Sequence, residues 1–139
     1  MTRLLVDTGP LVAIVDATDK DHDRCAGELK KLTDPLVTTW SVVTEATCLL
    51  GQTANPMDSQ DALLAAIERQ IVLVAAVAHA DLPPLRALLR KYRDLPMDLA
   101  DATLVRVAER DGIRQIFTLD RRDFEVYRIG RRDTFTIIP

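Results

Sequence analysis

The sequence has few of the residues on which many common active sites depend. It contains two histidines, two cysteines, one tryptophan, two tyrosines and three phenylalanines. His22 and His79 both fall at expected helix starts, with nothing to bring them together for acid–base catalysis. Cys25 and Cys48 are too few and too far apart for a disulfide framework or a CxxC zinc site, so we expect both to be reduced core residues on helices.

Long hydrophobic runs are also missing. No segment approaches the roughly 18 apolar residues of a membrane span, and the chain does not open with the basic start and long apolar segment of a secretory signal. These absences favour a cytoplasmic protein that does not cross a membrane. Hydrophobic residues still make up 47% of the chain, which is enough to bury a core. The length predicts one domain over residues 1–139.

The formal net charge of −3 argues against a nucleic-acid partner, because phosphate binding depends on Lys and Arg. The average conceals an asymmetry. Residues 1–85 carry 6 Lys and Arg against 12 Asp and Glu, whereas residues 86–139 carry 12 against 9. If metal neutralised several carboxylates, the working surface would be more positive than the formal count. Ordinary solvated helix faces are the alternative interpretation of these arginines.

Short apolar segments alternate with helical patterns along the chain. The first, at 3–6, is apolar on both parities and therefore predicts a fully buried strand of a parallel sheet. Further strands are expected at 36–39, 71–74 and 115–118, and the segments 126–129 and 135–138 should supply a last edge strand or hairpin, with 121–124 as a turn. The pattern predicts an α/β protein, a three-layer α/β/α sandwich with a mostly parallel central sheet of about five strands.

Four carboxylates are expected at one edge of this sheet. Asp7 follows the first strand, and in open α/β sheets the carboxyl ends of the strands border the ligand crevice. Asp120 follows the fourth strand in the same way. Glu45 and Asp101 lie in early turns of helices expected to start at this edge, although a first-turn glutamate favoured by the helix dipole can also be exposed and idle.

Gathered carboxylates repel one another and raise one another's pKa, a cost that Mg²⁺ or Mn²⁺ removes by binding their oxygens. Hard cations held in this way recur in enzymes that hydrolyse phosphodiesters. Asp98 is either an outer metal ligand or a helix cap. Asp123 competes with the favoured Asp120 for the fourth acidic position, but it suits a turn better. Thr8 and Thr118 either donate hydrogen bonds to the metal-binding carboxylates or serve as turn residues.

Four segments resemble the acidic motifs of PIN-domain nucleases of the VapC-type toxin branch, namely 5–13, 44–46, 99–102 and 117–124. The resemblance runs in order through nearly the whole chain and implies a PIN-like fold. It implies that Asp7, Glu45 and Asp101 hold the metal and that Asp120 fills the fourth acidic position. It also implies a Mg²⁺- or Mn²⁺-dependent endoribonuclease that cleaves single-stranded RNA, forms a homodimer and pairs with a small antitoxin protein in a type II toxin–antitoxin system.

Arg121 and Arg122 directly follow the fourth acid and are the expected RNA phosphate contacts. An aspartyl-phosphate phosphatase would need a second aspartate where Gly9 stands, and a receiver domain would need an aspartate after the third strand, where 74–76 offers none. The alternative of a different class is a PIN-like module that binds RNA or protein without cleaving it. The presence of all four acids counts against that alternative.

Overall fold

The central sheet contains five short strands that pair only in parallel. The computed structural model describes residues 3–139, so the first two residues of the predicted domain lie outside the described part. The strands are β1 (Leu4–Val6), β2 (Leu36–Thr38), β3 (Val72–Val74), β4 (Gln115–Phe117) and β7 (Thr136–Ile138), in the order β3-β2-β1-β4-β7. All three residues of the central strand β1 are fully buried, as its uninterrupted apolar sequence predicts.

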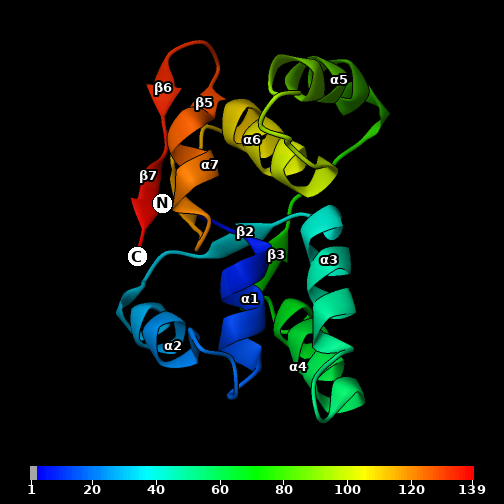
Figure 1. The fold of residues 1–139 in the computed structure, drawn as a ribbon, viewed down its shortest axis with the longest axis vertical. Helices are drawn as coiled ribbons and strands as arrows, with labels where there is room; N and C mark the ends of the chain where they lie inside the picture. The colour runs from blue at the N-terminus through cyan, green and yellow to red at the C-terminus, as the bar shows by residue number, and fades with distance from the viewer. Residues whose placement is uncertain (1–2) are drawn as a thin grey trace.

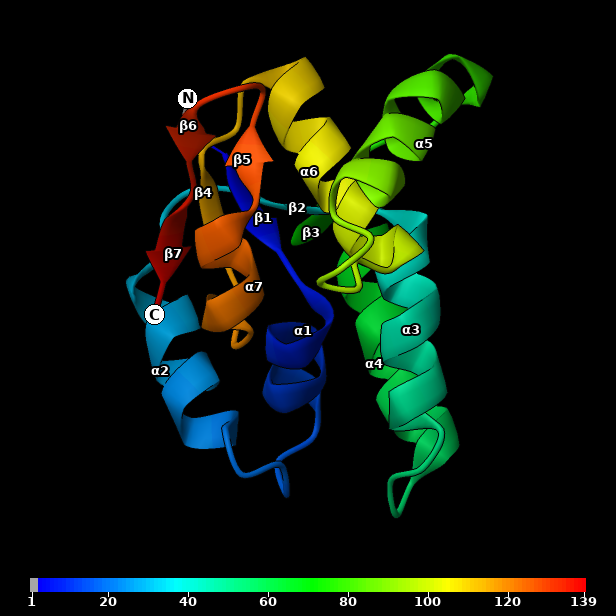
Figure 2. The same ribbon diagram turned by 45° about the horizontal axis from the view of Figure 1, so that its top comes forward.

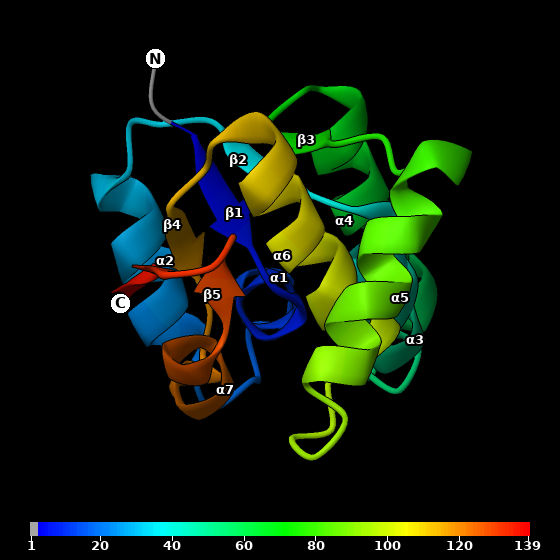
Figure 3. The same ribbon diagram turned by 90° about the horizontal axis from the view of Figure 1, so that it is seen from above.

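Helices cover both faces of the sheet, which confirms the predicted α/β/α sandwich (Figure 1). The helices are α1 (Thr8–Val15), α2 (His22–Lys31), α3 (Trp40–Leu50), α4 (Pro56–Glu68), the 3₁₀ turn η1 (His79–Asp81), α5 (Leu82–Lys91), α6 (Leu99–Asp111) and α7 (Arg121–Val126). The connections from β1 to β2 to β3 carry α1 to α4, and α1 packs against α2, α3 and α4. The reversed step from β3 to β4 places α5 and α6 on the other face of the sheet, where α6 crosses the sheet in Figure 3.

Three helices begin at the carboxyl edge of the sheet, each behind a side chain that caps its backbone amides. Asp7 caps α1, Thr39 caps α3, and Asp98 caps α6 by accepting a 2.8 Å hydrogen bond from the amide of Asp101. Gly112 ends α6 in the left-handed conformation at φ 69°, which glycine adopts without steric cost. These caps explain why the chain presents polar side chains where the strands stop.

The segment after β4 differs from the sequence prediction. The predicted turn at 121–124 is the first part of helix α7, because Phe124 and Tyr127 are three residues apart and both are fully buried, a spacing that one helical turn satisfies. The segment predicted to form a last edge strand or a hairpin contains one of each. β5 (Arg128–Ile129) and β6 (Asp133–Thr134) pair as an antiparallel hairpin, and β7 then adds to the edge of the main sheet beside β4 (Figure 2).

Helix α3 also corrects the prediction for Cys48. Cys25 is buried as expected, but Cys48 is exposed. The buried face of α3 consists of Val42, Val43, Ala46 and Leu50. Cys48 lies two residues from both Ala46 and Leu50, which turns its side chain to the opposite side of the helix. Within residues 3–139, no helix is both long enough and apolar enough to cross a membrane.

Candidate active site

The carboxyl ends of β1 and β4 open into a pocket of about 480 Å³ that is rich in carboxylates. We call it the acidic pocket. Six acidic residues line it, together with Thr8, Gly9, Leu49, Pro96 and Leu119; the acids are Asp7, Glu45, Asp98, Asp101, Asp120 and Asp123. No Lys or Arg is among the described residues that line it. The structure therefore brings all four predicted acids to one pocket, along with both of the acids whose roles were left open.

Asp7 is the most enclosed of these acids, and its side chain is held at both oxygens. Its Oδ1 accepts a 2.8 Å hydrogen bond from the amide of Thr8, and its Oδ2 accepts one of 2.9 Å from the hydroxyl of Thr118. The Thr118 hydroxyl in turn accepts a 3.0 Å bond from the amide of Asp120. Burial raises the pKa of Asp7 despite these donors, and the nearby Asp120 and Asp98 raise it further.

Asp101 projects from the first turn of α6 into the same pocket. Its Oδ2 accepts a 3.0 Å hydrogen bond from the hydroxyl of Tyr127. Burial, followed by the like charges of Asp7 and Asp98, raises the pKa of Asp101 to about 7, and the Tyr127 hydrogen bond only partly opposes this rise. Burial and the Asp101 carboxylate also raise the pKa of Tyr127, so the phenol stays protonated and acts as a donor.

The remaining acids are more open. Glu45 is exposed on α3, and partial burial together with Asp98 and Asp7 raises its pKa. Asp120 precedes α7 without capping it. Asp123, in the first turn of α7, is half-buried beside Asp120, and burial and that neighbour raise its pKa. Asp123 therefore reaches the pocket because its segment is a helix, whereas the sequence favoured a turn residue there.

The donor set of the pocket fits a hard divalent cation. All six side chains offer carboxylate oxygens, the ligands that Mg²⁺ and Mn²⁺ prefer. The hydroxyl of Thr8 at the pocket wall is buried and has no hydrogen-bond partner among the described residues, so the pocket also holds an unsatisfied polar group. Within residues 3–139, no three His, Cys, Asp or Glu side chains stand close enough to share one ion in this arrangement.

The predicted RNA contacts and the histidines lie outside the residues that line the acidic pocket. Arg121 donates a 2.8 Å hydrogen bond to the carbonyl of Pro139 and lies 3.5 Å from a carboxylate oxygen of Glu125. Arg122 is exposed on the same helix. His22 Nδ1 lies 2.7 Å from the carbonyl oxygen of Ala13. Neither histidine reaches the pocket in the described structure, which leaves the carboxylates as its titratable groups.

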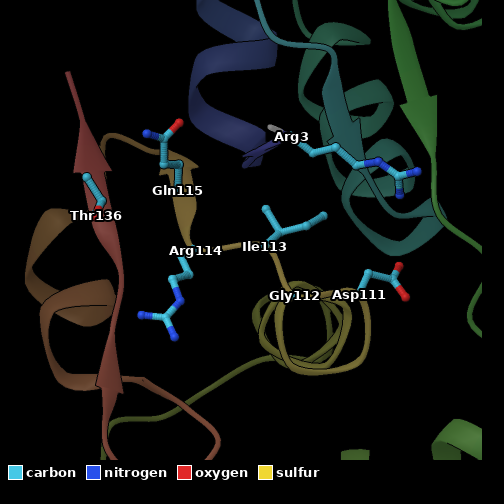
Figure 4. Close-up of a pocket in the computed structure, with 7 residues that line it drawn as sticks. All are labelled: Arg3, Asp111, Gly112, Ile113, Arg114, Gln115 and Thr136. Atoms are coloured by element: carbon cyan, nitrogen blue, oxygen red, sulfur yellow. The ribbon is translucent and has the colours of Figure 1, made fainter. Parts of the chain in front are cut away.

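A larger cavity of about 700 Å³ lies at the opposite, amino end of the strands (Figure 4). Arg3, Gln115 and Thr136 line it where β1, β4 and β7 begin. Its one carboxylate, Asp111, is already paired with Arg110 at 2.9 Å. Because it gathers no set of uncompensated reactive groups, its greater size does not make it the better candidate.

The parallel sheet with a pocket at its carboxyl edge places the chain in the class of open α/β proteins, which bind ligands at that edge. The profile of the PIN domain matches residues 4–130, and the chain belongs to the PIN domain family. The chain is 32% identical over 136 residues to Ribonuclease VapC26 of Mycobacterium tuberculosis, covering 98% of this chain and 100% of that protein. The family predicted from the sequence is thus confirmed.

Two solved structures resemble the fold. The Mycobacterium tuberculosis toxin VapC20, described as cleaving the sarcin–ricin loop, matches with a TM-score of 0.74 and 20% identity over 81% of this chain and 86% of that one. VapBC2 of Rickettsia felis, bound to a DNA fragment from its promoter, matches with a TM-score of 0.66 and 13% identity over 99% of this chain and 100% of that one. At these identities the likeness concerns the fold alone.

Tyr127, whose hydroxyl contacts Asp101, is a site residue that the sequence did not predict. A buried tyrosine close behind an acidic motif was the available signal, since a buried phenol needs a hydrogen-bond partner. That signal names no partner, because the two residues are 26 positions apart. For Asp98 the structure shows the capping role that the sequence had left open beside metal binding.

Proposed function

We propose that this chain is a Mg²⁺- or Mn²⁺-dependent endoribonuclease that cleaves single-stranded RNA as the toxin of a type II toxin–antitoxin pair. The observation that carries the proposal is a pocket of six carboxylates, with no Lys or Arg among its described lining residues, in a PIN-family chain related to a ribonuclease. Asp7, Glu45 and Asp101 would hold the metal, with Asp120 as the fourth acid. A divalent cation there would neutralise charge at the scissile phosphate and activate water for in-line attack.

The chain's own residues divide into two groups. Asp7 and Asp101 are held by hydrogen bonds from Thr118 and Tyr127, so they form the fixed part of the site. Glu45 and Asp120 are exposed and form the part of the site that faces solvent. Thr118 both orients Asp7 and fixes the backbone that carries Asp120, which supports the role proposed for its hydroxyl.

A cleavage assay on end-labelled single-stranded RNA tests the proposal. Attack by water needs no ribose 2′-hydroxyl, so the products should carry 5′-phosphate and 3′-hydroxyl ends. Activity should vanish with chelator and return with Mg²⁺ or Mn²⁺. Cleavage that persists in chelator, or that leaves 2′,3′-cyclic phosphates, would refute the mechanism. RNA binding without any cleavage under these conditions would favour the non-catalytic interaction module.

An apolar groove of about 570 Å³ beside the acidic pocket supports the antitoxin partner. It shares Glu45, Leu49 and Asp98 with the pocket, and Leu49 and Leu99 are 43% and 53% exposed. A peptide with apolar anchors for this groove and a basic side chain for the acids would cover both. The homodimer remains a proposal from the family resemblance, and light scattering of the isolated chain would measure it.

A further inference from the structure

Of the two tyrosines, only Tyr127 makes a contact with a carboxylate of the acidic pocket. Its side chain is fully buried, and its hydroxyl donates to Asp101 Oδ2 at 3.0 Å. The contact joins the segment after α7 to the first turn of α6. It is the only hydrogen bond to the Asp101 side chain among the described residues, so the other carboxylate oxygen has no protein donor.

The phenol is placed by the aromatic core. Its ring packs edge-on against Tyr92 at 5.0 Å and against Phe124 at 5.1 Å between centroids. Phe124 in turn packs edge-on against Phe135 at 5.5 Å. Two aromatic rings therefore hold the Tyr127 ring directly, and rigid supports of this kind hold a functional side chain to its working geometry. The hydroxyl is therefore a fixed point against which Asp101 is oriented.

The chemistry of the contact also differs from that of an ion pair. A phenol donates one hydrogen bond and carries no charge, so it orients the carboxylate without neutralising it. An arginine at the same place would occupy the carboxylate with a cation of its own. A neutral donor leaves the negative charge of Asp101 available to a ligand in the pocket.

We propose that Tyr127 is a positioning residue of the metal site, which holds Asp101 Oδ2 so that Oδ1 is presented to the divalent cation. This inference rests on the proposed function. Tyr127 touches neither RNA nor metal in this role and acts only through Asp101.

The Tyr127→Phe variant tests the proposal because it removes one oxygen and keeps the ring. Mn²⁺ binding to the purified protein without RNA, measured by isothermal titration calorimetry, should weaken by about 10- to 100-fold, as is typical when a residue supporting a metal ligand is lost. RNA cleavage should fall at limiting Mn²⁺ and recover in part when Mn²⁺ is raised. The Mn²⁺ Kd separates a positioning role from a general loss of activity.

Tyr92→Phe is the matched control. Tyr92 is also buried, and its hydroxyl accepts a 2.9 Å hydrogen bond from the amide of Arg128 without reaching any acid of the pocket. Its loss should lower the melting temperature and leave the Mn²⁺ Kd unchanged. In an Asp101→Asn background, Tyr127→Phe should cause no further loss of Mn²⁺ affinity, because the two residues act as one unit.

The outcomes separate the two proposals. If Tyr127→Phe binds Mn²⁺ as the unmodified protein does, the positioning role is refuted while the nuclease stands. If the unmodified protein neither binds Mn²⁺ nor cleaves RNA, both proposals fail. An additive loss in the Asp101→Asn background, or a Tyr127→Phe chain that does not fold, would assign the hydroxyl to the fold and overturn the positioning role.

Discussion

Asp81 and Asp7 are both buried aspartates, 4% and 8% exposed, but their surroundings are opposite in charge. Asp81 accepts a 2.8 Å hydrogen bond from Arg106, one of 3.1 Å from Arg110 and one of 2.8 Å from the amide of Ala78. The Ala78 amide and the Arg106 guanidinium lower the pKa of Asp81. Asp7 has only an amide and a hydroxyl as donors, and burial raises its pKa.

Asp81 shows how the fold compensates the charge of a buried carboxylate that has a structural role. Around Asp81 two arginines from α6 supply the compensating charge within the chain. In the acidic pocket none of the lining residues that the structure describes supplies such a charge, although uncompensated buried carboxylates destabilise the protein. Sites that cost stability are typical of function, so the missing charge marks the place where a cation is expected to bind.

The largest expected effect concerns RNA cleavage. Asp101→Asn should reduce the rate by about a thousandfold or more, equivalent to about 4 kcal/mol in the activation barrier, because it removes a proposed metal ligand. Asp81→Asn, measured at a temperature where the variant is folded, should retain most of the activity. Equal losses in both variants would erase the distinction between the two carboxylates.

Thermal stability should depend more on Asp81 than on Asp101, which is the reverse of the order expected for RNA cleavage. Asp81→Asn leaves two arginines without their shared partner and should destabilise the protein by about 3 kcal/mol. For a domain of this size that corresponds to a fall in Tm of roughly 10 °C. Thermal unfolding without metal measures the change. An Asp81→Asn variant as stable as the unmodified protein would show that the ion pairs are not essential to the fold.

Added metal should stabilise the protein through the acidic pocket. At a hundredfold excess of Mn²⁺ over its Kd, mass action adds about 2.7 kcal/mol to the free energy of unfolding. Asp101→Asn should lose this response. Asp98→Asn should keep most of it, because Asp98 already caps α6 with its side chain. Full stabilisation of Asp101→Asn by Mn²⁺ would place the ion elsewhere.

The pH dependence of the metal-free protein gives a smaller effect with a defined sign. Because folding raises the pKa of Asp101 from 3.8 to about 7, the folded state binds its proton more tightly than the unfolded state. Stability from this group is therefore complete below about pH 4 and is lost as the pH rises to about 7.

Asp101→Asn cannot ionise and should not lose this stability. Its Tm should exceed that of the unmodified protein by a difference that grows from pH 4 to pH 7 and is constant above. Allowing for solvent screening of a partly exposed group, we expect about 1 kcal/mol at pH 8. A Tm below that of the unmodified protein at pH 8 would make Asp101 a structural hydrogen-bonding residue.

The smallest effect concerns Arg121 and Arg122, which the sequence predicts as phosphate contacts. Replacing both with Ala should weaken RNA binding across sequences and flatten its salt dependence, by a slope change of up to roughly 0.7 per lost phosphate contact on single strands. Arg121 already bonds Pro139 and lies near Glu125, so Arg122 should account for most of the change. Binding isotherms at several salt concentrations measure the slope. An unchanged slope would show that both arginines are ordinary surface residues.

The fold was largely predictable because its signals are local. An apolar run on both parities marks β1, Gly112 stops α6, and Thr39 caps α3. Helix α7 was not predictable, because four of its six residues are charged and Phe124 is its one buried residue. Cys48 was wrongly predicted to be buried, because apolar neighbours in the sequence of a helix do not show which face of that helix meets the core.

The convergence of the acids on one pocket followed from topology, because the carboxyl ends of parallel strands share an edge. The sequence indicated Thr118 as a hydrogen-bond donor to a metal-binding carboxylate, but it did not indicate which carboxylate, and it indicated no role for Tyr127. The Thr118 hydroxyl reaches Asp7 across 111 positions, and Tyr127 reaches Asp101 across 26. The pairing of partners so far apart in the chain depends on the packed core, so the neighbouring sequence does not identify the partner.

The hydrogen bond between Thr118 and Asp7 also has a consequence for the order of events during synthesis. β1 is synthesised before its neighbour β4 and the hydroxyl that orients Asp7, which are made more than a hundred residues later. At about 5–20 residues per second, the interval is at least roughly five seconds. During that interval a nascent chain carries Asp7 without the hydroxyl that holds it, and the acidic pocket is assembled only after β4 and Thr118 have been made.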